Sequence, residues 1–410
     1  MLTILKITGE KPLFFDPMTF FREKMYRIPT LFFVIIGLFF SLPTSSLAKD
    51  LLSKVVIVES SDAVRSFVPN SEKIREMVDI GIKEITGKET VLNGILSLIS
   101  TNDIVGIKVY TLHSETGGTR PEVVRAVVDV LKKAGLPLDH IILWDRSMDT
   151  LRSSGFLKLS KELKVGIAAS TVEGFDKEVS YNSFFPSSLV AGDVEFSNKN
   201  NFDITTIAPV DSDVGRRSFL TKLLTERITK IIMITPLLHH NLLGTTGHIY
   251  SLASGSTDNF LRFEMDGDRL AEAVSEIYAM EEVGDRVVLC ITDALLCQYR
   301  GQSNGFLHYS KPLNELRFSF DPVALDWMSL KTMLDIQNSV DGMNQSLSVF
   351  SPSGKTLCEN AILLELGNGN ESKLQVQRID IGKGLDSIKE PTLPKDITKK
   401  KSWWKFWKSR

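Results

Sequence analysis

The stretch that decides the fold is residues 104–147, IVGIKVYTLHSETGGTRPEVVRAVVDVLKKAGLPLDHIILWDRS. It begins with the apolar run 104–109, continues through a polar loop and an amphipathic segment, and ends with the apolar run 141–144. Strand, loop, helix and strand in this order make a parallel crossover. The sequence therefore predicts an open α/β sheet, and ligands bind such sheets at the carboxyl ends of the strands.

The helix of this crossover carries clear local signals. Thr119 and Glu122 form the pattern of a capping box around Pro121, and Gly135 stands where the helix is expected to end. Apolar side chains recur at helical spacing between these ends, at Val124, Val127, Val128 and Leu131. We expect a helix here whose first turn is capped by the Thr119 side chain.

The same alternation continues along the chain. Strand-like runs at 55–58, 231–234 and 287–291 are separated by helical patterns, and residues 316–320 alternate between apolar and polar side chains. The sequence predicts an α/β fold: a mostly parallel or mixed sheet with helices on both faces, an irregular insertion and a disordered basic C-terminal tail.

Domain organisation follows from changes in composition. Residues 1–48 are predicted to be a signal peptide or N-terminal membrane anchor, and 49–342 an α/β domain in which 160–215 forms an insertion or lobe. Residues 343–385 are expected to form a strand-containing extension, and 386–410 a linker and a basic Trp-rich tail. Two local expectations accompany this division: strands at 362–366 and 374–379, and a helix at 218–224.

The bulk composition is ordinary for a globular protein. The chain is 43% hydrophobic and 24% charged, with a formal net charge of −2. A general nucleic-acid binder needs a basic surface to neutralise phosphates, so no nucleic-acid partner is expected. The three cysteines, Cys290, Cys297 and Cys358, include no C-x-x-C pair, and no iron–sulfur cluster is expected.

The N-terminal segment has the pattern of an export signal. Three basic residues precede the apolar run 31–40, and Ser46 and Ala48 fit the small residues of a signal-peptidase site. The run is short for a bilayer span. We expect an exported protein of the periplasm or cell envelope, with an uncleaved membrane anchor and a buried helix of a cytosolic protein as the alternatives. The basic residues are Arg22, Lys24 and Arg27.

The C-terminal tail is basic and aromatic. Residues 395–410 contain seven Lys or Arg against one acid, and three of the five tryptophans of the chain. Tryptophan favours the membrane interface and lysine attracts anionic lipid. The tail is predicted to contact a membrane surface, and the alternative is a solvated tail without a partner.

Several segments together resemble one family. The runs Val105–Val109, Arg120–Val124 and Ile142–Ser147, followed by Asn241–Gly247, Ile291–Leu295 and Asp321–Asp326, are similar to the domain of unknown function 362 family over residues 100–335. The resemblance implies an α/β domain that is often exported. It also implies ferredoxin-type modules in some members, whose cluster cysteines this chain lacks.

This chain departs from the family pattern at two places. The pattern has Asn after G-I-K-V, where this chain has Tyr110. It has Lys-Asn after the Gly-Thr-Gly stretch, where this chain has Tyr250-Ser251. The departures imply a different ligand, or loss of the activity that relatives have.

Charged side chains lie at the ends of the predicted strands. Lys108 comes one residue before the end of its strand, Asp145 and Arg146 follow another, and Asp293 follows a third. A buried lysine can act as a base or hold an anion, and carboxylates at one sheet edge can act as acid and base. These four residues are the predicted catalytic set. The alternatives are a lysine that covers apolar surface, helix caps, and an ion pair with Arg146.

Two further groups could bind a cofactor or a ligand. Gly117, Gly118 and Thr119 open a helix and could hold a phosphate or carboxylate with free N–H groups, joined by Asn241 from another loop. His239 with Asp145 and Asp293 could hold a divalent metal. A divalent metal is therefore the cofactor that the sequence allows. Capping alone and polar loop residues are the structural alternatives. 

Two functions fit these observations. The first is an exported enzyme, metal-assisted or not, that acts on a small polar or anionic substrate. The second is a non-catalytic envelope protein that binds a ligand with the same cleft and a membrane with its tail. Tyr110 and Tyr250, at positions where the family pattern is polar, favour the second.

Overall fold

The computed structural model describes residues 52–111, 117–183, 217–301 and 306–383. The predicted signal segment, the linker and the Trp-rich tail lie outside the described residues. Within the described part, no helix is both long enough and apolar enough to cross a membrane.

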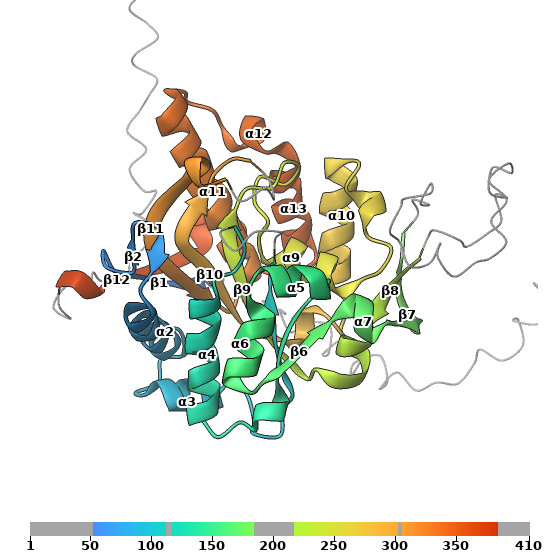
Figure 1. Cartoon of the computed structure of the whole chain (residues 1–410). Coiled ribbons are helices and arrows are strands. Elements are labelled where there is room, and N and C mark those ends of the chain that lie inside the picture. Colours follow the sequence, from blue (N-terminus) through green and yellow to red (C-terminus); the bar gives the residue numbers. More distant parts are fainter. Residues whose placement is uncertain (1–51, 112–116, 184–216, 302–305, 384–410) are drawn as a thin grey trace, which may run out of the picture. The chain divides into compact units, whose positions relative to one another are not determined.

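The core of the fold is an eight-stranded mixed sheet in the order β12-β1-β11-β10-β9-β4-β5-β6 (Figure 1). Pairing is parallel from β10 through β6 and between β1 and β12, whereas β11 runs antiparallel to both of its neighbours. The mixed α/β fold expected from the sequence is confirmed. The strands are β1 (Ser53–Glu59), β4 (Val105–Val109), β5 (Ile141–Asp145), β6 (Gly166–Ala169), β9 (Lys230–Leu238), β10 (Val287–Gln298), β11 (Ser310–Ser319) and β12 (Leu374–Asp380).

Helices cover both faces of this sheet (Figure 1). One face packs in a hydrophobic cluster with α2 (Ser71–Thr86), α3 (Val91–Leu96), α4 (Pro121–Lys133), α5 (Met148–Ser153) and α6 (Phe156–Leu163). The other face packs with α9 (His248–Ser256), α10 (Gly267–Tyr278), α11 (Pro322–Asp341) and α13 (Pro352–Leu363). Because both faces are covered, every residue of the central strands β4 and β5 is buried.

The direction of the chain through the sheet reverses between β4 and β9. After β4 the chain passes through α4 to β5 and on to β6, toward one edge. After β9 it passes through α9 and α10 to β10, toward the other edge. The two connections cover opposite faces, so their starting loops separate at the carboxyl ends of β4 and β9. This is a topological switch point, where open α/β sheets place their ligands.

Smaller elements lie outside the main sheet. Two short hairpin sheets are formed by β2 (Val64–Arg65) with β3 (Val68–Pro69), and by β7 (Phe175–Asn182) with β8 (Arg217–Thr221). The remaining short α-helices of the described residues are α7 (Ser170–Glu173) and α12 (Leu347–Phe350). Of the expected insertion 160–215, β6 belongs to the main sheet, β7 belongs to a hairpin, and 184–216 lies outside the described residues.

Three local expectations are wrong. The N-cap of α4 is Arg120, which makes no side-chain cap, because the Thr119 hydroxyl donates instead to the Ile234 carbonyl oxygen at 2.7 Å. Residues 218–221 pair as a strand and not as a helix, and 362–363 end α13 in place of a strand. The strand expected at 374–379 is confirmed as β12, which joins the main sheet beside β1. A contact with another strand overrides the local pattern at Thr119 and in β8.

Candidate functional site

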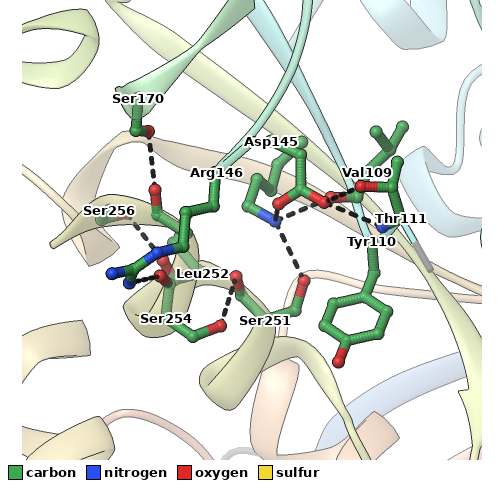
Figure 2. Close-up of polar contacts among 12 residues, drawn as sticks. Val109, Tyr110, Thr111, Asp145, Arg146, Ser170, Ser251, Leu252, Ser254 and Ser256 are labelled. Carbon is green, nitrogen blue, oxygen red and sulfur yellow. Dashed lines mark hydrogen bonds and ion pairs between the residues drawn. The ribbon is translucent and has the colours of Figure 1, made fainter. Parts of the chain in front are cut away.

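A buried ion pair stands at the carboxyl ends of β4 and β5. The Lys108 ammonium lies 2.8 Å from Oδ1 of Asp145. It also lies 2.7 Å from the Val109 carbonyl oxygen and 3.3 Å from the Ser251 hydroxyl. Oδ2 of Asp145 accepts hydrogen bonds from the N–H of Thr111 at 2.8 Å and its hydroxyl at 2.6 Å. Figure 2 shows Asp145, Thr111 and Ser251 meeting from three separate elements.

Both partners of this pair are saturated. Lys108 is fully buried and Asp145 is 6% exposed, and each hydrogen of the ammonium has an acceptor. Burial lowers the pKa of Lys108, while the Asp145 carboxylate opposes that shift. Helix α9 approaches so closely that a Cβ on Gly255 would lie 2.4 Å from Cε of Lys108. The two residues meet as the sequence suggested, in a neutralised contact closed to solvent.

The Arg146 side chain binds backbone carbonyl groups. Its guanidinium donates to the carbonyl oxygens of Ser254 at 3.0 Å, Thr257 at 2.8 Å and Asp258 at 2.5 Å. These carbonyls lie at and just beyond the end of α9, where a helix leaves unsatisfied acceptors. A cation in this position also complements the negative end of the helix dipole. The geometry assigns Arg146 a capping role that holds α9 against β5.

Asp293 forms a second buried ion pair. Its Oδ1 lies 2.9 Å from Nη1 of Arg120, and its Oδ2 accepts the backbone N–H of the same residue at 2.9 Å. Asp293 is fully buried and Arg120 is 7% exposed. The carboxylate therefore occupies the place at the start of α4 where the sequence suggested a bound phosphate or carboxylate.

The glycine loop before α4 is correspondingly engaged. Gly117 and Gly118 are buried, and Thr119 donates its N–H to the Tyr110 carbonyl oxygen at 2.9 Å. With the N–H of Arg120 bonded to Asp293, neither of these two N–H groups remains for an external anion. Thr119 thus ties this loop to β4 and, through its hydroxyl, to β9.

The two ion pairs point to opposite faces of the sheet. Ile107 and Val109, on either side of Lys108, pack in the cluster covered by α4, so the lysine side chain leaves β4 on the face covered by α9. Ile291 packs in the same cluster as Ile107, and Asp293, two residues on, shares its face. The structure therefore brings Lys108 to Asp145 and keeps Asp293 apart from both.

A cavity of about 300 Å³ opens at the carboxyl ends of β4 and β9. We call it the switch-point cavity. Its polar lining comes from the residue after β4, the loop after β9, helix α9 and the residue that ends the turn Leu261–Phe263. These side chains are Tyr110, His239, His240, Asn241, Thr246, Tyr250 and Glu264. Asn241, predicted as a ligand-binding residue, therefore lines a cavity, although not the one formed by the glycine loop.

The two adjacent histidines both line this cavity. Burial lowers the pKa of His239 to about 4, helped by the charge of Arg300. Burial also lowers the pKa of His240 to about 4, and Nδ1 of that ring accepts the N–H groups of Leu242 at 3.3 Å and Leu243 at 3.2 Å. Both imidazoles are neutral at pH 7 because their pKa values lie well below it.

The predicted metal set is not assembled. Asp145 is engaged by Lys108, Asp293 by Arg120, and His239 lines the switch-point cavity. Across the residues that the structure describes, no three His, Cys, Asp or Glu side chains are grouped so that they could hold a metal ion.

Aromatic rings and one carboxylate complete the switch-point cavity. The Tyr250 hydroxyl donates to Oε1 of Glu264 at 2.7 Å, and its ring centroid lies 4.6 Å from that of His240 and 6.3 Å from that of Tyr110. Burial raises the pKa of Tyr110, and the carboxylates of Asp145 and Glu264 raise it further. In Figure 2 the ring of Tyr110 extends away from Asp145.

No sequence motif points to Glu264, and the two tyrosines stand out in the sequence only as departures from the family pattern. Tyr110 and Tyr250 lie far apart in the chain but are in contact here, beside Ser251, which touches Lys108. Two departures from a family pattern that lie far apart in the sequence can therefore indicate residues that are in contact in the fold. Glu264 lies in a short turn with no local motif, so only the tertiary fold reveals its place.

A buried His–Asp contact lies outside the cavity. The Nδ1 of His248 lies 3.0 Å from Oδ1 of Asp326, and its Nε2 lies 3.1 Å from the Thr235 hydroxyl. Asp326 also accepts the backbone N–H groups of His248 at 2.6 Å and Ile249 at 3.1 Å. A carboxylate that accepts the first N–H groups of α9 stabilises the helix start. The residues of this contact, His248, Asp326, Thr235 and Ile249, are all buried. We therefore assign the contact a structural role.

A second cavity, of about 480 Å³, lies at the start of α4. It is lined by Arg120, Glu122, Arg125 and Lys158 among others. Arg120 is paired with Asp293 and Arg125 with Glu162, which leaves basic and acidic groups mixed in one lining.

Comparison with known proteins identifies the family. No curated protein matches the chain. A crystal structure of a protein from Thermotoga maritima, a Northeast Structural Genomics Consortium target, is similar at 13% identity and a TM-score of 0.35, over 77% of this chain and 62% of that one. The chain thus spans less than two thirds of that protein, and the TM-score is too low to establish a common fold. The family model of the domain of unknown function 362 matches residues 105–331, more than half of the chain. The chain belongs to this family.

Proposed function

We propose that this protein binds a small polar ligand in the switch-point cavity. The observation that carries the proposal is the position of the cavity at the carboxyl ends of β4 and β9, where the chain reverses its direction through the sheet. Ligands of open α/β sheets bind at such points because the two diverging loops leave a crevice between them.

The lining of the cavity supports this proposal. Its volume of about 300 Å³ is at the lower end of the range for small-molecule sites. Aromatic faces alternate there with a few polar groups, which is the composition that fixes the orientation of a ligand. The saturated Lys108–Asp145 pair holds the end of β4 to β5 and α9, so the lining rests on rigid elements.

The proposal is for binding in place of catalysis. The four residues expected to be catalytic are engaged elsewhere: Lys108 with Asp145, Asp293 with Arg120, and Arg146 with the carbonyls that end α9. A general base must reach the proton that it removes, and a buried, fully bonded ammonium or carboxylate does not. Of the two functions that the sequence left open, the ligand-binding protein therefore fits better.

Blocking the cavity tests this proposal. Asn241 is exposed and lines the cavity, so Asn241→Trp is expected to fill its entrance. Asn102→Trp, at an exposed position before β4 and thus at the opposite edge of the sheet, is the matched control. Ligand-detected NMR with a panel of small polar molecules of both charges should find binders to the parent protein and to Asn102→Trp that Asn241→Trp has lost. Binders that Asn241→Trp retains, or an absence of binders, would refute the proposal.

Export and membrane contact form a separate proposal. It is supported by the basic, apolar and small-residue pattern of the N-terminal segment and by the lysines and tryptophans of 395–410. N-terminal sequencing of protein from the extracytoplasmic fraction should begin at Lys49. Co-sedimentation with anionic vesicles should weaken on deletion of 395–410. A mature N-terminus upstream of Phe21, or equal sedimentation with and without the tail, would contradict the respective part.

A further inference from the structure

We infer that the switch-point cavity selects a small organic cation, with Glu264 as its counter-ion and the rings of Tyr110, Tyr250 and His240 as its walls. The inference rests on the proposed function, because it names the charge class of the ligand bound in the same cavity.

The carboxylate of Glu264 has no basic partner within the described ranges. Its side chain is partly buried and lines the cavity, and Oε1 accepts the Tyr250 hydroxyl at 2.7 Å. No lysine, arginine or histidine in the described ranges pairs with this carboxylate. A partly buried carboxylate without a cation is costly unless a partner compensates its charge. A bound ammonium group would supply that compensation.

The second step is the aromatic surface around this carboxylate. The ring of Tyr250 contacts those of His240 and Tyr110, with centroid distances of 4.6 Å and 6.3 Å and tilted planes. A cation over the face of a tyrosine ring is attracted by about 0.5–2 kcal/mol, and most where water is excluded. Aromatic walls with one acidic group suit an alkylammonium, whose methyl groups pack on the rings.

The third step is the lack of positive charge in the lining. Its two basic side chains are the histidines, and burial lowers the pKa of His239 and of His240 to about 4. The nearest buried lysine, Lys108, is neutralised by Asp145. The carboxyl group of Glu264 therefore meets no cationic side chain within the lining. An anion entering here would meet repulsion with no ion-pairing group.

Three probes with a similar branched head group differ in their charge. Choline carries a quaternary ammonium, its carbon isostere replaces that nitrogen with carbon, and pivalate carries the same branched group on a carboxylate. Isothermal titration calorimetry on the full chain should show choline binding about tenfold or more tighter than the isostere. Pivalate should show no binding.

Variants test which groups provide the selectivity. Glu264→Gln keeps an oxygen for the Tyr250 hydroxyl and removes the charge, so choline affinity should fall about tenfold or more while the isostere is unaffected. Tyr110→Leu should weaken choline by about threefold or more through loss of a ring face. Glu272→Gln removes an exposed carboxylate of α10 that does not line this cavity, and should leave affinity unchanged.

The outcomes separate this inference from the proposed function. Equal affinity for choline and its isostere, or preferential binding of pivalate, would overturn the cation inference while the cavity remains a ligand site. Choline binding that is unchanged in Glu264→Gln would also overturn it. If choline does not bind at millimolar concentration, the inference is wrong, and the polar panel with Asn241→Trp then decides the proposed function by itself.

Discussion

The Lys108–Asp145 pair should be among the most costly contacts to break in this protein. In Lys108→Met the carboxylate of Asp145 stays buried with only the two hydrogen bonds from Thr111. In Asp145→Asn the ammonium stays buried with only neutral acceptors, Val109 and Ser251. Removing one member of a buried ion pair costs about 3–5 kcal/mol because the other charge is left uncompensated. Each single variant should therefore lose about 3–5 kcal/mol of unfolding free energy.

The double variant sharpens this prediction. Lys108→Met/Asp145→Asn leaves no uncompensated charge, because the amide can still accept from Thr111 and the thioether fills the volume of the lysine stem. Its loss should be smaller than the sum of the single losses by about 2 kcal/mol or more. Urea unfolding curves with equal slopes measure all three values. Lys158→Met, at an exposed site of α6, should change stability by less than about 0.5 kcal/mol. Additive losses, or single losses near that of Lys158→Met, would show that the two charges do not compensate each other.

Three further predictions concern the same region. The pKa of His239 and of His240 is lowered from 6.5 to about 4, so the unfolded chain binds more protons than the folded protein between those pH values. The unfolding free energy should therefore fall as pH decreases through this window, by up to about 3 kcal/mol per histidine. A His239→Gln/His240→Gln variant with an unchanged pH slope would contradict this. Gly255→Ala should lower stability by about 1–3 kcal/mol, because the new Cβ would lie 2.4 Å from Cε of Lys108. This overpacking exceeds the gain of about 1 kcal/mol in helix propensity. A raised temperature of thermal unfolding would show instead that α9 can move away from Lys108. Arg146→Met should leave carbonyls at the end of α9 unsatisfied, so amide hydrogen exchange in α9 should accelerate. Exchange in α2 should stay as it is in the parent protein. Unchanged exchange in both helices would argue against the capping role.

Much of the architecture could be predicted from the sequence. The crossover from β4 to β5 follows from two apolar runs and a helical spacing, and parallel strands bring their carboxyl ends to one edge. That rule places Lys108 beside Asp145, as observed. Asp321 caps α11 with Pro322 in its first turn, and such a cap can be predicted because it depends only on adjacent residues.

What the sequence could not supply depends on contacts between distant residues. The order of strands places β9 between β4 and β10, and strand alternation then sends Asp293 to the face opposite Lys108. The Thr119 hydroxyl had two competing uses, and its bond to β9 prevails over the helix cap. Glu264 follows the short turn Leu261–Phe263, and its carboxylate meets the Tyr250 hydroxyl only in the folded protein. Local pattern carries no information about such contacts.

The most direct test of the ligand site is a crystal structure of the protein soaked with the polar molecules that bind in solution. Ligand density is expected in the switch-point cavity, in contact with Tyr110 and His240 and within hydrogen-bond distance of Glu264. Density in the cavity between Arg120 and Lys158 instead, with the switch-point cavity empty at full soak concentration, would contradict it.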